Sequence, residues 1–194
     1  MAKVAIGVLE AQNRPLEWVR QISIVIGASL FVALCAKVTL PLPFTPVPLT
    51  MQNFGVLTVA LLLGSRRGFA ALALYLMEGA MGLPVFSPSP LGLHGIAQLL
   101  GPTGGFLMAY PFVAFVAGWV YEHTSRRAVW AALSAAAGEV VLFVGGLGWL
   151  FVFTHSVATA VKWGLYWFIF AEVIKILMAS AVASRWNRKL SPQN

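Results

Sequence analysis

Aspartate is absent from this chain of 194 residues, whose six acidic side chains are all glutamate. That absence removes the usual partner of histidine in many catalytic triads and a common metal ligand. Cys35 is the single cysteine, so the chain cannot form an internal disulfide. The His-Glu-x-x-His, paired Cys-x-x-Cys and Gly-x-Ser-x-Gly motifs are also missing. The residue types therefore give no catalytic constellation, and we expect neither an enzyme nor a bound cofactor.

Charged residues are also scarce: they make up 10% of the chain, against 59% hydrophobic residues, and the mean hydropathy is +0.83. A soluble domain carries about 25% charged residues. The composition therefore predicts an all-α integral membrane protein, and the length suits one transmembrane domain over residues 1–194. The net charge of +7 comes from small basic clusters between apolar runs. That pattern is typical of membrane topology, so we expect a lipid bilayer and no nucleic acid as a partner.

Six apolar stretches are expected to cross the membrane, at residues 22–40, 53–64, 68–83, 105–121, 128–153 and 161–183. The second and third are shorter than the roughly 20 residues that a full crossing needs. We interpret them as two short helices joined by a turn at residues 65–68, because the adjacent Arg66 and Arg67 would be very unfavourable at the bilayer centre. Four or five spans are the alternative.

The basic residues predict the orientation of the chain. A six-span chain places ten of them on one side: Lys3, Arg14, Arg20, Arg66, Arg67, Arg126, Arg127, Arg185, Arg188 and Lys189. By the positive-inside rule that side is the cytoplasm. Residues 1–20 and 185–194 are then cytoplasmic ends, and the N-terminal segment lacks the pattern of a cleaved signal peptide. We expect a multi-pass membrane protein with both termini in the cytoplasm.

Glu172 and Lys175 lie in the middle of the last apolar stretch. Their spacing puts them on one face of a helix, roughly 4.5 Å apart along its axis. Ionisable groups at membrane depth are costly, so this pair should face the protein interior or a watery cavity. It is either a salt bridge that fixes helix packing, or a site where Lys175 meets an anionic group and Glu172 accepts ligand N–H groups. For Glu78 and Glu139, the sequence does not decide between neutral carboxyl groups and pairs with lysine.

Two predicted outer loops are distinctive. Residues 41–48 contain four prolines, which make the segment stiff and extended. Such a segment either covers a cavity or serves as a rigid connector. The loop at residues 84–104 is long and rich in Gly, Pro and Ser, and long loops of this kind are often functional.

Several motifs, in this order, resemble the BioY family, the biotin-specific substrate-binding components of energy-coupling-factor (ECF) transporters. They are Pro41-Leu42-Pro43-Phe44-Thr45-Pro46-Val47-Pro48-Leu49-Thr50-Met51-Gln52, Leu63-Gly64-Ser65-Arg66-Arg67-Gly68, Gly79-Ala80-Met81-Gly82-Leu83-Pro84-Val85-Phe86 and Leu100-Gly101-Pro102-Thr103-Gly104-Gly105. The resemblance implies a six-helix protein that captures biotin from outside with high affinity. It also implies a transmembrane coupling subunit and ATP-binding subunits as partners, although Ser29 and Ala33 replace the pair of alanines associated with docking on the coupling subunit.

The resemblance also implies a site. In the family an acidic residue and a lysine three positions later line the biotin site, and Glu172 and Lys175 match them, with Phe170-Ala171-Glu172 in place of a Pro-Gly-Asp run. Biotin offers a carboxylate tail, a ureido head with two N–H donors, and an apolar ring, so it needs a cation, acceptors and apolar walls. The expected site comprises Lys175, Glu172, Phe44, Thr45, Val47, Pro48, Gln52, Tyr75, Glu78, Phe86, Thr103 and Gly104.

Three other functions stay open at this stage. The same architecture serves capture proteins for other vitamins. An intramembrane enzyme would use Glu78 or Glu139 with His94 or His155. A proton-coupled or stand-alone transporter would use the glutamates.

Overall fold

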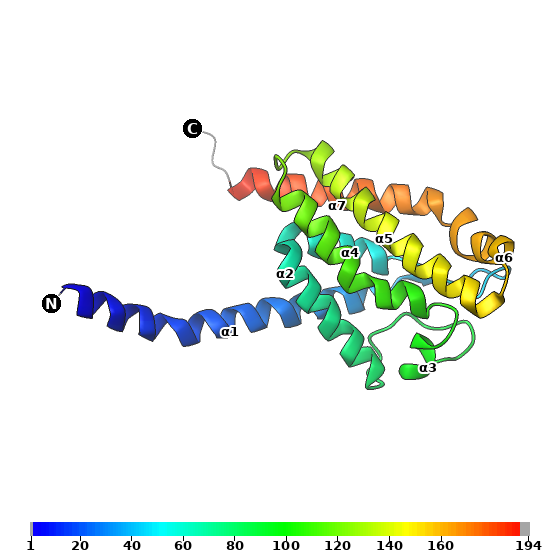
Figure 1. The fold of residues 1–194 in the computed structure, drawn as a ribbon, viewed down its shortest axis with the longest axis horizontal. Helices are drawn as coiled ribbons and strands as arrows, with labels where there is room; N and C mark the ends of the chain where they lie inside the picture. The colour runs from blue at the N-terminus through cyan, green and yellow to red at the C-terminus, as the bar shows by residue number, and fades with distance from the viewer. Residues whose placement is uncertain (1, 191–194) are drawn as a thin grey trace.

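The computed structural model describes the backbone of residues 2–190 and the side chains of residues 16–189, and the last part of the predicted tail at 185–194 lies outside them. The chain forms a helical bundle from which the N-terminal part of the first helix projects (Figure 1). Its helices are α1 (Ala2–Lys37), α2 (Gln52–Ala80), α3 (Ile96–Leu99), α4 (Gly104–Glu122), α5 (Ala128–Thr154), α6 (Val157–Val161), the π-helical turn η1 (Lys162–Tyr166) and α7 (Ile169–Leu190). Two short strands, β1 (Thr39–Leu40) and β2 (Leu49–Thr50), pair antiparallel.

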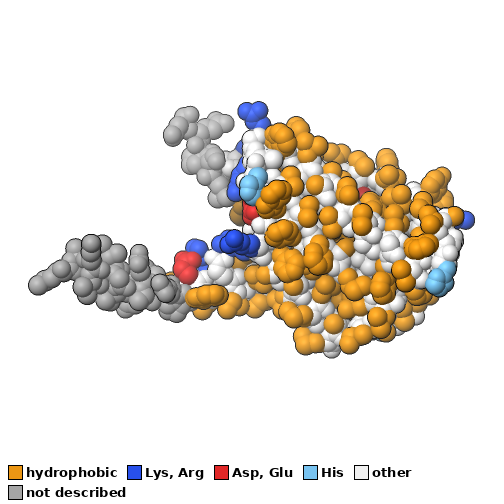
Figure 2. Space-filling model, in the orientation of Figure 1, with side chains coloured by type: hydrophobic (Ala, Val, Ile, Leu, Met, Phe, Trp, Pro, Cys, Tyr) orange, Lys and Arg blue, Asp and Glu red, His pale blue; other side chains and the backbone are white. Residues whose placement is uncertain are grey.

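The prediction of a helical protein with several helices able to cross a membrane is confirmed. Four helices are long and apolar enough to cross a membrane: Leu16–Lys37, Gln52–Ala80, Gly104–Glu122 and Ala128–Thr154. A fifth candidate is the pair Val157–Tyr166 and Ile169–Lys189, which is bent by 41° at a short break. Hydrophobic side chains cover most of the visible side of the body (Figure 2), as expected for a surface in contact with lipid.

The helix α2 is a hairpin rather than one rod. Gly64 has a φ of +80°, a left-handed conformation that glycine adopts without a side-chain clash. The Nε2 of Gln52 donates to the hydroxyl of Tyr75 at 2.8 Å, although a straight helix would separate these residues by about 34 Å. The chain therefore folds back at Gly64, immediately before the turn predicted at residues 65–68.

The tip of this hairpin shares one end of the bundle with the ends of α4 and α7. The carboxylate of Glu122 accepts hydrogen bonds from the backbone N–H and the hydroxyl of Ser65, at 2.9 and 2.7 Å. Beside it, the amide of Asn187 donates to the hydroxyl of Tyr121 at 2.7 Å. Most of the visible Lys and Arg side chains gather at the end where α7 terminates (Figure 2). The basic clusters that are separate in sequence thus come together in space.

The loops meet at the other end of the bundle. The ribbon of β1 and β2 brackets the proline-rich segment, whose Thr45 hydroxyl donates to the carbonyl of Trp163 in η1 at 2.9 Å. Lys37, at the end of α1, donates to the carbonyl of Phe86 at 3.0 Å. The Thr45 bond ties the proline-rich segment to η1 at this end of the bundle, and the Lys37 bond ties the end of α1 to the loop that contains Phe86.

Candidate functional site

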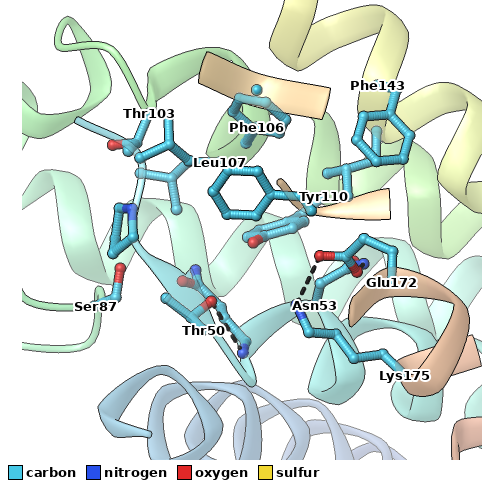
Figure 3. Close-up of a pocket in the computed structure, with 16 residues that line it drawn as sticks. Thr50, Asn53, Ser87, Thr103, Phe106, Leu107, Tyr110, Phe143, Glu172 and Lys175 are labelled. Carbon is cyan, nitrogen blue, oxygen red and sulfur yellow. Dashed lines mark hydrogen bonds and ion pairs between the residues drawn. The ribbon is translucent and has the colours of Figure 1, made fainter. Parts of the chain in front are cut away.

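A cavity lies below the proline-rich segment, among α2, α4, α5 and α7. Its lining residues are Val47, Pro48, Thr50, Gln52, Asn53, Ser87, Thr103, Phe106, Leu107, Tyr110, Leu142, Phe143, Gly164, Phe168, Glu172 and Lys175 (Figure 3). Its internal void is about 50 Å³, room for a few water molecules at about 10–15 Å³ each. Sites for drug-sized ligands span about 300 Å³ or more, so side chains in the lining must move to admit such a ligand.

The charged side of the cavity is the pair that the sequence singles out. The Nζ of Lys175 lies 2.6 Å from Oε1 of Glu172, and the exposed fractions of the two side chains are 6% and 8%. The π-helical turn η1 precedes α7, and such turns occur often at functional sites. This irregular turn, with the bend that follows it, sets the direction in which α7 carries the pair toward the cavity.

Asn53, near the start of α2, joins this pair to a second carboxyl group. Its Nδ2 donates to Oε2 of Glu172 at 2.6 Å and to Oε1 of Glu139, in α5, at 2.5 Å. The exposed fraction of each of the three residues is at most 6%. The structure therefore pairs Glu139 with an amide, a possibility that the sequence did not suggest. A buried polar network of this kind links three helices at the depth of the cavity.

The remaining walls of the cavity are largely aromatic. Phe106 and Tyr110 extend from α4 and Phe143 from α5 (Figure 3). Phe168, in the turn before α7, lines the cavity as well. Phe168 and Tyr110 are both buried. A cavity with one charged side and apolar walls suits a ligand that has a polar head on an apolar body.

Half of the twelve predicted site residues line the cavity: Lys175, Glu172, Val47, Pro48, Gln52 and Thr103. Their roles in binding stay predictions.

The other six predicted site residues lie outside the lining of the cavity. Phe44 and Thr45 line a shallow depression on the surface of the proline-rich segment. The rings of Tyr75 and Phe86 pack against each other, with centroids 5.3 Å apart, behind Gln52. Glu78 accepts a hydrogen bond from Ser29 of α1.

Gly104, the last of these six, starts α4 where a Cβ would lie 1.7 Å from the carbonyl oxygen of Leu99. Its role in the structure is therefore close packing of the loop onto α4. Sequence reasoning also missed residues that do line the cavity, chiefly Asn53 and the four aromatic side chains. Asn53 carried one available signal, because it is a polar residue beside Gln52 at the start of an apolar stretch.

Comparisons with known proteins identify relatives of this chain in sequence and in fold. The family model described as "BioY family" matches residues 7–192. The biotin transporter BioY of Thermotoga maritima is 36% identical over 82% of this chain and 93% of its own length. Biotin transporter BioY2 of Lactococcus lactis subsp. cremoris is 34% identical over 88% of this chain and 91% of its own length.

The fold also matches a solved structure, that of the S-component for biotin from an ECF-type ABC transporter. The TM-score is 0.78 at 24% identity, over 89% of this chain and 93% of the other. The family match covers nearly the whole chain, and two full-length relatives exceed 30% identity. This chain belongs to the BioY family.

Proposed function

We propose that this chain captures biotin on the outer side of a bacterial cytoplasmic membrane and serves as the S component of an ECF-type transporter. The observation that carries the proposal is the buried pair of Glu172 and Lys175 inside an aromatic-walled cavity. Membership of the BioY family, whose relatives include biotin transporters, supports the ligand and the class of activity. The chain is accordingly a transport protein and not an enzyme.

The balanced charge of the pair suits the neutral ureido head of biotin. Since Lys175 already has a carboxylate at 2.6 Å, it can donate a further hydrogen bond to the ureido carbonyl. Glu172 retains lone pairs that can accept a ureido N–H. The aromatic side chains would then enclose the ring system, and the carboxylate tail would point toward the mouth of the cavity. This assignment differs from the sequence-based expectation that Lys175 meets an anionic group of the ligand.

We further propose six membrane crossings, with both termini in the cytoplasm. The hairpin at Gly64 supports this count, since its two arms are antiparallel and a tip exposing Arg66 and Arg67 separates them. Arg126, Arg127 and Arg185 belong to the same end of the bundle as this tip, and the positive-inside rule places that end in the cytoplasm. The cavity and the proline-rich segment would then face outward.

The proposed partners are a transmembrane coupling subunit and ATP-binding subunits. The sequence carries no Walker-type nucleotide motif, so the ATP-driven step belongs to another chain. The solved relative of the same fold is an S-component of an ECF-type ABC transporter, which supports this assignment.

Binding of purified protein to biotin, thiamine and riboflavin tests the proposed ligand. The protein in detergent is titrated with each vitamin by calorimetry, and bound biotin is then challenged with the other two. We expect saturable binding of biotin that neither thiamine nor riboflavin displaces. Tighter binding of thiamine or riboflavin would make the chain a capture protein for a different vitamin.

A test of energy coupling separates the proposed transporter from a proton-driven one. Labelled biotin is added to cells that carry this chain with its coupling and ATP-binding subunits, and its uptake is measured. Uptake is expected to survive collapse of the proton gradient and to stop on ATP depletion. Uptake that follows the proton gradient would favour the secondary transporter.

A further inference from the structure

The amide of Asn53 has an acceptor that nothing in the described part of the chain uses. Both hydrogens of its Nδ2 are committed, one to Glu139 and one to Glu172. Its Oδ1 is buried and has no hydrogen-bond partner among the described residues. Asn53 itself lines the cavity beside Glu172 and Lys175 (Figure 3). A buried carbonyl oxygen without a partner is unfavourable, so its retention at this place calls for a function.

The orientation of this amide is fixed by its neighbours. Rotation of the amide by 180° would place Oδ1 against the oxygens of two carboxyl groups and leave the NH₂ group without an acceptor. Glu172 reaches the amide from α7 and Glu139 from α5, so two separate helices hold it in one orientation. The free acceptor is therefore preorganised, which lowers the entropic cost of using it in binding.

We propose that Oδ1 of Asn53 accepts an N–H group of the ligand and selects for ligands that carry one there, and that Glu139 is the positioning residue that fixes this acceptor. The inference rests on the proposed function, because the ureido head of biotin supplies such an N–H group. A ligand N–H gives the buried oxygen its missing partner. A ligand with an oxygen atom in place of this N–H group leaves Oδ1 without a partner, because two hydrogen-bond acceptors then face each other.

The consequence is that the site selects for an N–H group at the ligand position that faces Asn53, which Glu172 and Lys175 do not contact. A site that hydrogen-bonds a donor rejects analogues that lack it, because the polar group of the site is left unpaired. The expected penalty for one such unsatisfied group corresponds to about a 10- to 100-fold loss of affinity.

The test compares biotin with two cyclic carbamate analogues, each with oxygen in place of one ureido N–H group. Affinities are measured by calorimetry for the wild-type protein and for Asn53→Leu, which is nearly isosteric. The wild-type protein should bind both carbamates more weakly than biotin, because Glu172 is proposed to accept one ureido N–H group and Asn53 the other, and the carbamate that lacks the N–H group facing Asn53 should lose about 10- to 100-fold. In Asn53→Leu that ratio should fall to about threefold or less, as in a double-mutant cycle.

Thr58→Val is the matched control, since Thr58 is also buried on α2 but does not line the cavity. It should preserve both the affinity for biotin and the ratio. If Asn53→Leu does not fold, the wild-type arm decides alone: a carbamate that binds as tightly as biotin overturns the inference, because the account needs an acceptor for each ureido N–H group. An unchanged ratio in a folded Asn53→Leu overturns it as well, while the proposed function stands. A wild-type protein that binds no biotin overturns both.

Glu139→Gln tests the positioning role. Its amide can donate to Oδ1 and so lets the Asn53 side chain turn over. We expect the ratio between biotin and the carbamate to fall toward that of Asn53→Leu, while Glu139→Asp keeps at least part of it. A Glu139→Gln protein with the full wild-type ratio would show that Glu139 does not position the acceptor.

Discussion

The ammonium of Lys175 lies 2.6 Å from the carboxylate of Glu172, one turn earlier on the same helix, and both side chains are almost fully buried. Burial shields both groups from bulk water. Taking either partner away would leave a charge alone at membrane depth, which is very unfavourable. The pair therefore has to be treated as one unit, both for the stability of the bundle and for binding.

Lys175→Ala is expected to abolish biotin binding, with at least a 100-fold loss of affinity. The substitution removes the proposed donor to the ureido carbonyl and leaves the Glu172 carboxylate without its cation. Calorimetric titration of the purified variant measures the loss. Lys162→Ala is the control, because Lys162 is exposed at the start of η1 and does not line the cavity. Equal affinities of wild type and Lys175→Ala would refute the assigned site.

Phe168→Ala is expected to weaken biotin binding more than Phe44→Ala. Phe168 is buried and lines the cavity, so its removal opens the apolar wall. Phe44 is 44% exposed and packs on Trp167 with ring centroids 4.5 Å apart. Its removal therefore affects only the packing of the proline-rich segment above the cavity.

The two aromatic variants are compared by equilibrium affinity and by dissociation rate. A loss of roughly 10- to 100-fold is expected for Phe168→Ala, in line with the energy of a buried aromatic anchor. For Phe44→Ala we expect a smaller loss that arises from faster dissociation. A larger loss for Phe44→Ala would mean that ligand contacts lie in the proline-rich segment rather than at the cavity wall.

The sequence predicted the hairpin and the charged pair because each has a local signature. Arg66 and Arg67 interrupt an apolar stretch, and Gly64 beside them can take a left-handed conformation. Glu172 and Lys175 stand out because charges are rare within apolar stretches. Features of this kind depend on the chemistry of neighbouring residues, so they are visible without knowledge of the packing.

The cavity wall and the partner of Glu139 had no such signature. Phe106 and Phe112 both lie on α4, yet 9% of the first is exposed and 57% of the second. Lipid is as apolar as the protein interior, so hydrophobic periodicity does not separate the two faces of a membrane helix. The contact of Asn53 with Glu139 depends on how α2 and α5 are rotated against each other, and that rotation is a property of the whole bundle.

Gly118→Ala is expected to destabilise the protein strongly. A Cβ at this position of α4 would lie 2.5 Å from the backbone nitrogen of Ser65, so the hairpin tip could not stay in place. Overpacking of this kind costs about 1–3 kcal/mol, and more where backbone must move. Gly148→Ala is the control, because a Cβ there meets no atom within 4 Å. Thermal unfolding in detergent should show a lower midpoint for Gly118→Ala only, and equal midpoints would contradict the packing of α4 on the hairpin.

The proposed orientation predicts which loops an impermeant thiol reagent reaches. In a Cys35→Ala background, a cysteine is placed either at exposed His94 or at exposed Ser125. Intact cells should label His94→Cys, whereas Ser125→Cys should react only after the membrane is opened. Labelling of Ser125→Cys in intact cells would reverse the orientation, and labelling of both would contradict the six-span topology.

The position of biotin in a crystal structure of this protein tests the central claim most directly. We predict that its ureido head lies within hydrogen-bond distance of Glu172 and Lys175, with its rings against Phe106, Tyr110 and Phe168. Bound biotin found outside this cavity, or inside it with no contact between its ureido group and the Glu172–Lys175 pair, would contradict the account.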